Sequence, residues 1–167
     1  METFAPAVNI DPGLAALWRD TALGCIFWSA PVLPQEPQLW QYFASHTQPR
    51  LAQMLESTEL ADMPQIGPSR RAFKAFGRDP GRVRISSEAL YRRLRQGKEL
   101  YHINTAVDAN NLVSLETGFS LGTYDLGCLQ GDLVLRLGHE GEDYSGIGKD
   151  KLDLCRQRIQ QLTCGHR

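Results

Sequence analysis

Residues 70–98 read RRAFKAFGRDPGRVRISSEALYRRLRQGK. This stretch holds ten Lys or Arg residues and only two acids, Asp79 and Glu88. The whole chain of 167 residues has 18 basic and 19 acidic residues, so the remainder carries 8 basic and 17 acidic ones. A strongly positive segment inside an acidic chain is typical of a surface that binds a polyanion, although an ordinary solvated surface has the same composition.

The pattern within this stretch predicts two short helices joined by a turn. The first helix opens at Pro68 and Ser69 and ends at Gly77. The second is capped by Ser86 and ends at Gly97. Apolar residues fall on one face of each helix and basic residues on the other. The residues that we expect to contact the polyanion are Arg70, Arg71, Lys74, Arg92, Arg93 and Arg95.

The rest of the chain predicts a mixed α+β class, because helical and strand patterns alternate irregularly. Helices are expected from Asp11, from Gln38 with a break at Pro49, and over residues 106–116 up to Gly118. Strands are expected over residues 4–10, 22–28, 119–124 and 133–137. Residues 144–147 are expected to pair back on the 133–137 strand as a hairpin.

Composition narrows the chemistry further. The length suits one domain with a real core, and no apolar run approaches the roughly 20 residues of a membrane span. The N-terminus lacks a signal-peptide pattern, which makes cytoplasmic residence the expectation. Cys25, Cys128, Cys155 and Cys164 are scattered, which favours free thiols. The sequence contains no Ser-His-Asp or Cys-His arrangement, phosphate-binding loop or zinc site, so we expect neither a metal nor a cofactor.

Five motifs occur in order along the chain: RAFKAFG at 71–77, SSEALYRR at 86–93, NxxVDxNN at 104–111, SLGxYD at 120–125 and GDLVLR at 131–136. This set resembles the B3/B4 domain of the β subunit of bacterial phenylalanyl-tRNA synthetase, and more closely its free-standing relatives, over residues 15–153. The resemblance implies a mixed sheet flanked by helices. It divides the chain into a B3/B4-like domain, residues 1–153, and a divergent tail, residues 154–167.

The resemblance also implies a function. In the synthetase this domain removes tyrosine wrongly attached to the phenylalanine tRNA, without a metal, so tRNA or aminoacyl-tRNA is the expected partner. Matching the motifs places the expected catalytic residues at Asn110, Asn111 and Asp150. The substrate-binding positions fall at Gly122, Tyr124 and Asp125. A histidine that precedes the Phe-Asp pair in the synthetase is missing here.

Other interpretations remain open at this point. Asp108, Asn110 and Asp125 have the spacing of simple helix and turn ties. The chain could also be a non-catalytic RNA-binding or protein-interaction module, or a shortened fragment without independent function. The family continues beyond the equivalent of Asp153, so we expect the sheet to be incomplete at the C-terminus and to self-associate through an uncovered edge. The alternative is a terminal helix in the tail.

Overall fold

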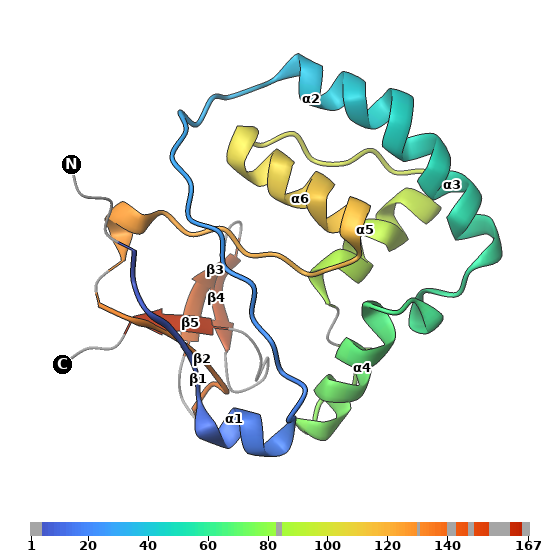
Figure 1. Cartoon of the computed structure of the whole chain (residues 1–167). Helices are drawn as coiled ribbons and strands as arrows, with labels where there is room; N and C mark the ends of the chain where they lie inside the picture. Colours follow the sequence, from blue (N-terminus) through green and yellow to red (C-terminus); the bar gives the residue numbers. More distant parts are fainter. Residues whose placement is uncertain are drawn as a thin grey trace. The chain divides into compact units, whose positions relative to one another are not determined.

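The computed structural model describes residues 5–82, 85–129, 131–139, 143–146, 149–153 and 161–164. The chain has an α+β fold, as the sequence predicts, and it divides into two units (Figure 1). Unit 1 comprises Met1–Trp28, Ala72–Val83 and Tyr124–Arg167, and unit 2 comprises Ser29–Arg71 and Arg84–Thr123. Unit 1 contains all the described strands, whereas unit 2 is helical.

A three-stranded mixed sheet lies at the centre of unit 1. Its order is β1 (Val8–Ile10), β2 (Leu133–Arg136) and β5 (Gln161–Cys164). β2 pairs in parallel with β1 and antiparallel with β5. Along β2, Leu133 and Leu135 are buried while the residues between them are only half-buried, which is the two-residue period of a strand with one face on a core. The predicted strand at 133–137 is confirmed.

Helix α1 (Pro12–Leu17) covers part of this sheet. The side chain of Asp11 caps it by accepting a hydrogen bond from the backbone N–H of Leu14 at 3.0 Å. Leu14 then packs with Phe76 and Leu135 in a buried cluster, to which Ile10, Trp18, Ala72 and Leu137 add half-buried side chains.

The predicted hairpin partner was wrong. β3 (Asp143–Gly146) pairs with β4 (Lys149–Asp153), and not with β2. The second neighbour of β2 is β5, which lies in the segment expected to be a divergent tail. β2 therefore has a strand on each side, and the outer strands of this sheet are β1 and β5.

Unit 2 is built from helices that run along the chain with short connections. They are α2 (Pro37–Tyr42), a π-helical turn (Phe43–Thr47), α3 (Gln48–Ser57), a 3₁₀ turn (Leu60–Asp62), α4 (Ile66–Ala75), α5 (Ser86–Arg95) and α6 (Thr105–Thr117). Residues 66–71 of α4 belong to unit 2 and residues 72–75 to unit 1. The core of unit 2 includes Leu51, Leu55, Leu60, Ile66, Tyr91, Leu112 and Leu115.

The π-helical turn explains the predicted break at Pro49. Proline has no N–H to donate to the carbonyl of Ser45, and its ring would contact that carbonyl in a regular α-helix. The chain instead widens by one residue, and the N–H of Gln48 donates to the carbonyl of Phe43, five positions earlier. α3 then continues from Gln48.

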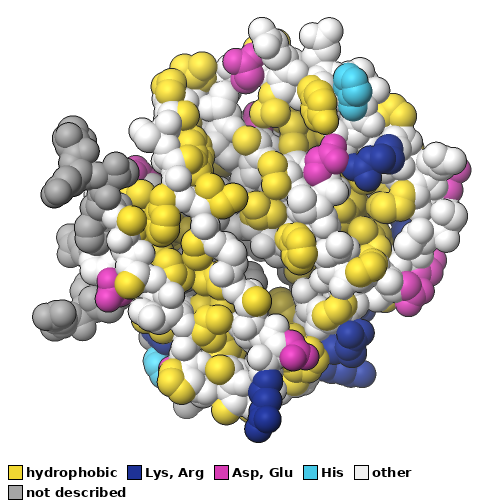
Figure 2. All heavy atoms as spheres, in the orientation of Figure 1, with side chains coloured by type: hydrophobic (Ala, Val, Ile, Leu, Met, Phe, Trp, Pro, Cys, Tyr) yellow, Lys and Arg dark blue, Asp and Glu magenta, His cyan; other side chains and the backbone are white. Residues whose placement is uncertain are grey.

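Two predicted strands do not form. Residues 22–28 and 119–124 have irregular backbone, and the Ile26 side chain is 86% exposed. A strand needs a partner, and both sides of β2 are already occupied by β1 and β5. Hydrophobic side chains accordingly lie open over much of the face drawn in Figure 2. Within the described residues, no helix is long and apolar enough to cross a membrane.

Candidate functional site

The basic residues predicted to bind a polyanion lie on α4 and α5. Both helices end at glycines with left-handed backbone, Gly77 at φ 75° and Gly97 at φ 66°, as the sequence predicts. The starts differ slightly from the prediction. α4 begins at Ile66, and the cap position of α5 is Ile85 instead of Ser86, without a side-chain hydrogen bond.

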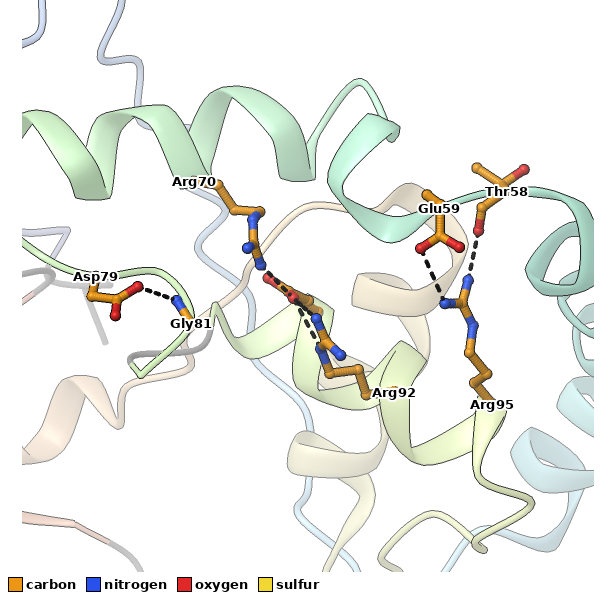
Figure 3. Close-up of polar contacts among 8 residues, drawn as sticks. Thr58, Glu59, Arg70, Asp79, Gly81, Arg92 and Arg95 are labelled. Atoms are coloured by element: carbon orange, nitrogen blue, oxygen red, sulfur yellow. Dashed lines mark hydrogen bonds and ion pairs between the residues drawn. The ribbon is translucent and has the colours of Figure 1, made fainter.

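Arg70 of α4 and Arg92 of α5 bind the same carboxylate, that of Glu88 (Figure 3). Arg70 Nη1 lies 2.7 Å from Glu88 Oε1, and Arg92 donates to the same oxygen from Nε at 2.9 Å and from Nη2 at 2.7 Å. The Glu88 side chain is fully buried, while those of Arg70 and Arg92 are 24% and 43% exposed.

The other two arginines of α5 also bond to the protein. Arg93 lies over the ring of Tyr101 at 3.9 Å, and its Nη1 donates to the Tyr101 hydroxyl at 3.0 Å. Arg95 donates to the carbonyl of Thr58 at 2.6 Å and lies 3.7 Å from the carboxylate of Glu59 (Figure 3). These contacts tie both ends of the 96–100 connection and the end of α3 to α5.

Arg71 and Lys74 differ from the four arginines just described. Both are exposed, and neither makes a hydrogen bond or ion pair with any residue that the structure describes. They are three positions apart on α4, so their side chains leave the helix on the same side. We call Arg71 and Lys74 the free basic pair of α4.

The polar cluster of α6 begins with a structural tie. Asp108 is buried, and its carboxylate accepts hydrogen bonds from the Trp40 indole at 3.1 Å and from the N–H of Ile103 at 2.9 Å. Both of its oxygens are therefore engaged. Asp108 joins α2, the 101–104 segment and α6 within unit 2.

Asn110 and Asn111, the expected catalytic amides, have different surroundings. Asn110 Oδ1 accepts a hydrogen bond from the Thr123 hydroxyl at 2.9 Å, which holds the segment containing Gly122 beside α6. The Asn111 side chain is half-buried and makes no hydrogen bond to a described residue. Consecutive residues of a helix point about 100° apart, so the two amides do not share one face.

The remaining predicted site residues belong to unit 1. Tyr124 and Asp125 are exposed. Asp125 caps the 3₁₀ turn Leu126–Cys128 by accepting the N–H of Gly127 at 2.9 Å. Asp150 lies on β4, and its side chain is outside the described part. The structure thus brings Asn110 and the segment of Gly122 together within unit 2, and it shows Asp108, Asn110 and Asp125 in tie contacts.

Sequence reasoning noted Glu88 only as an acid in the first turn of its helix and missed its two arginine partners. The four-residue spacing from Glu88 to Arg92 is a signal that could have predicted one of the two ion pairs. The contact with Arg70 depends on the packing of two helices and leaves no local pattern. Among the described residues, no three His, Cys, Asp or Glu side chains come close enough to hold a metal ion.

Comparison with known proteins follows from these positions. The family profile of the B3/4 domain matches residues 68–165, which is more than half of the chain. The matched range contains the basic residues of α4 and α5, the polar cluster of α6 and β2 to β5. Searches of curated proteins and of solved structures returned no match. The chain belongs to the B3/4 domain family.

Proposed function

We propose that this protein binds tRNA through phosphate contacts of the basic residues on α4 and α5. The observation that carries the proposal is the free basic pair, Arg71 and Lys74, which is exposed and has no partner among the described residues. Neutralising these charges with phosphate breaks no internal ion pair. The likeness of the 71–111 motifs to a tRNA-editing domain supports tRNA as the polyanion, and such a ligand agrees with the cytoplasmic location expected from the sequence.

Salt dependence tests the proposal. Each Lys or Arg that neutralises a phosphate releases counterions, so the logarithm of affinity falls with the logarithm of salt by about 0.7 to 0.9 per contact. We expect Arg71→Gln and Lys74→Gln each to weaken the binding of labelled tRNA about fivefold at low salt and to flatten the slope by about one unit.

Arg19→Gln is the matched control, because Arg19 is exposed, lies outside α4 and α5, and has no partner among the described residues. It removes the same charge and should leave the slope unchanged. The proposal fails if affinity does not depend on salt, or if Arg71→Gln and Arg19→Gln behave alike.

Hydrolysis of a mischarged tRNA is the second candidate function. The Thr123–Asn110 hydrogen bond favours it, because this bond holds the Gly122 segment against α6 and leaves the Asn110 amide nitrogen without a described partner. Metal-free ester hydrolysis needs a positioned water and donors for the developing oxyanion. Asn110 and Asn111 would supply the donors and Asp150 would hold the water, with Gly122, Tyr124 and Asp125 around the substrate.

A deacylation assay with tyrosine attached to the phenylalanine tRNA tests this second function. We expect Asn111→Ala and Asp150→Ala to slow release at least tenfold without changing tRNA affinity, and a large side chain at Gly122 to block it. Activity should survive a chelator. Release no faster than the blank, or inhibition by a chelator that zinc reverses, would leave a binding module without this chemistry.

A further inference from the structure

Glu88 is a buried carboxylate with an unbalanced set of contacts. Three N–H donors, one from Arg70 and two from Arg92, converge on Oε1. The other oxygen, Oε2, is buried and has no hydrogen-bond partner among the described residues. A buried charge stabilises a fold poorly unless its remaining lone pairs are satisfied. The arrangement is therefore a weak device for stability, and another role has to explain it.

The two guanidinium groups lie between this carboxylate and solvent. Glu88 is fully buried, whereas Arg70 and Arg92 are partly exposed. Nε and Nη2 of Arg70 and Nη1 of Arg92 make no hydrogen bond to a described residue, and none of them is buried. Unused donors of both arginines are thus open to a ligand, and the three side chains together keep one positive charge.

Glu88 also fixes the distance between the two arginines. Arg70 Nη1 and Arg92 Nη2 both lie 2.7 Å from the same oxygen atom, so they are at most twice that distance apart. Two free guanidinium groups would repel each other at this separation. The carboxylate below them makes the pair stable in the absence of a ligand, with donors spaced so that the oxygens of one phosphate can reach both.

We propose that Glu88 is a positioning residue that holds Arg70 and Arg92 as a two-guanidinium clamp for one backbone phosphate of RNA. This inference rests on the proposed tRNA binding and adds to it a specific subsite. Preorganisation of this kind lowers the ordering cost of binding, because two long side chains are already fixed before the phosphate arrives.

The clamp makes an unusual prediction about charge. Glu88→Gln removes a negative charge next to the phosphate, so electrostatics alone predicts tighter binding of tRNA. If Glu88 positions the arginines, the same change weakens binding, because an amide holds two guanidinium groups less firmly. Glu59→Gln is the matched control. It removes one negative charge beside Arg95, from an exposed side chain, and should leave affinity unchanged or increase it.

The experiment measures tRNA affinity of the full chain at low salt for the wild type, Glu88→Gln and Glu59→Gln, with circular dichroism to confirm folding. We expect Glu88→Gln to bind about five- to tenfold more weakly. Arg70→Lys and Arg92→Lys keep the charge but lose the planar fork, and they should bind about fivefold more weakly even if Glu88→Gln does not fold. Wild-type affinity in all folded variants overturns the clamp.

The outcomes separate the clamp from the proposed function. If Arg71→Gln weakens tRNA binding but Glu88→Gln and the two lysine variants do not, tRNA binding stands and the clamp fails. If the wild type does not bind tRNA, both fail. Inorganic phosphate gives the last arm. Phosphate binding that needs Arg70 and Arg92, together with tRNA binding that does not, would assign the site to free phosphate and overturn the RNA clamp.

Discussion

Replacing Tyr91 by Phe removes one hydroxyl from the centre of unit 2. Tyr91 is 1% exposed, and its hydroxyl donates to the carbonyl of Leu115 at 2.6 Å. Leu115 lies in the last turn of α6, where the carbonyls have no intrahelical partner. The bond therefore satisfies an acceptor that would otherwise be unpaired in the core, and it links α5 to α6.

The size of the effect follows from burial. Leaving a buried acceptor without its donor costs about 1–3 kcal/mol, so we expect Tyr91→Phe to lower the free energy of unfolding by about 2 kcal/mol near pH 7. For a chain of this length that loss lowers the melting temperature by about 4–8 °C. The ring itself stays, so no cavity contributes.

The effect should depend on pH in a defined direction. Burial raises the pKa of the Tyr91 phenol above its usual value of 10.0, with nearby Arg50 opposing this shift and Glu116 adding to it. A pKa that is raised in the folded state means that stability is complete below pH 10 and is lost as pH rises further. Tyr91→Phe cannot lose stability by this route. The difference between the two proteins should therefore shrink above about pH 10.

Urea unfolding followed by circular dichroism, near pH 7 and near pH 10.5, measures both effects. Tyr42→Phe is the control, because the Tyr42 side chain is 56% exposed and the change should cost less than about 0.5 kcal/mol. A destabilisation by Tyr91→Phe that stays constant across this pH range would refute the argument from burial.

Two further predictions concern the backbone. Gly118→Ala and Gly97→Ala both place a side chain on left-handed backbone, which costs about 1–2 kcal/mol, but the new Cβ at position 118 would also lie 3.0 Å from Gln65 Oε1, whereas the one at position 97 meets open space. Urea unfolding should show the larger loss for Gly118→Ala, and equal losses would contradict the packing argument. Asp11→Ala should cost about 1 kcal/mol by removing the cap on Leu14, while Asp11→Asn should stay close to the wild type in thermal melts. A neutral Asp11→Ala would contradict the capping role.

Local signals predicted the helices of this chain well. Gly77, Gly97 and Gly118 end helices with positive φ, as expected, because only glycine adopts that backbone without strain. The α+β class and the β2 strand were also predicted. The strand partners were not, because pairing depends on segments far apart in sequence. The apolar run at 22–28 has the composition of a buried strand, yet it has no partner in the described sheet.

The candidate site shows the same division. Composition located the positive segment, and the resemblance pointed to the polar cluster of α6. Neither could show that Arg70 and Arg92 share the Glu88 carboxylate, or that Asp108 is occupied by Trp40 and Ile103. A sequence counts charges, whereas their availability depends on which helices pack together.

The place of β1 in its sheet has a consequence for synthesis on the ribosome. The contacts of β1 and β2 join residues 125 positions apart, as in the bond from the N–H of Ala7 to Asp132. At about 5–20 residues per second, a nascent β1 waits roughly 6–25 s for its partner to be made. All of unit 2 is translated within that interval. Its helices, rich in local contacts, can therefore fold first, and unit 1 assembles around a helical insert that already exists.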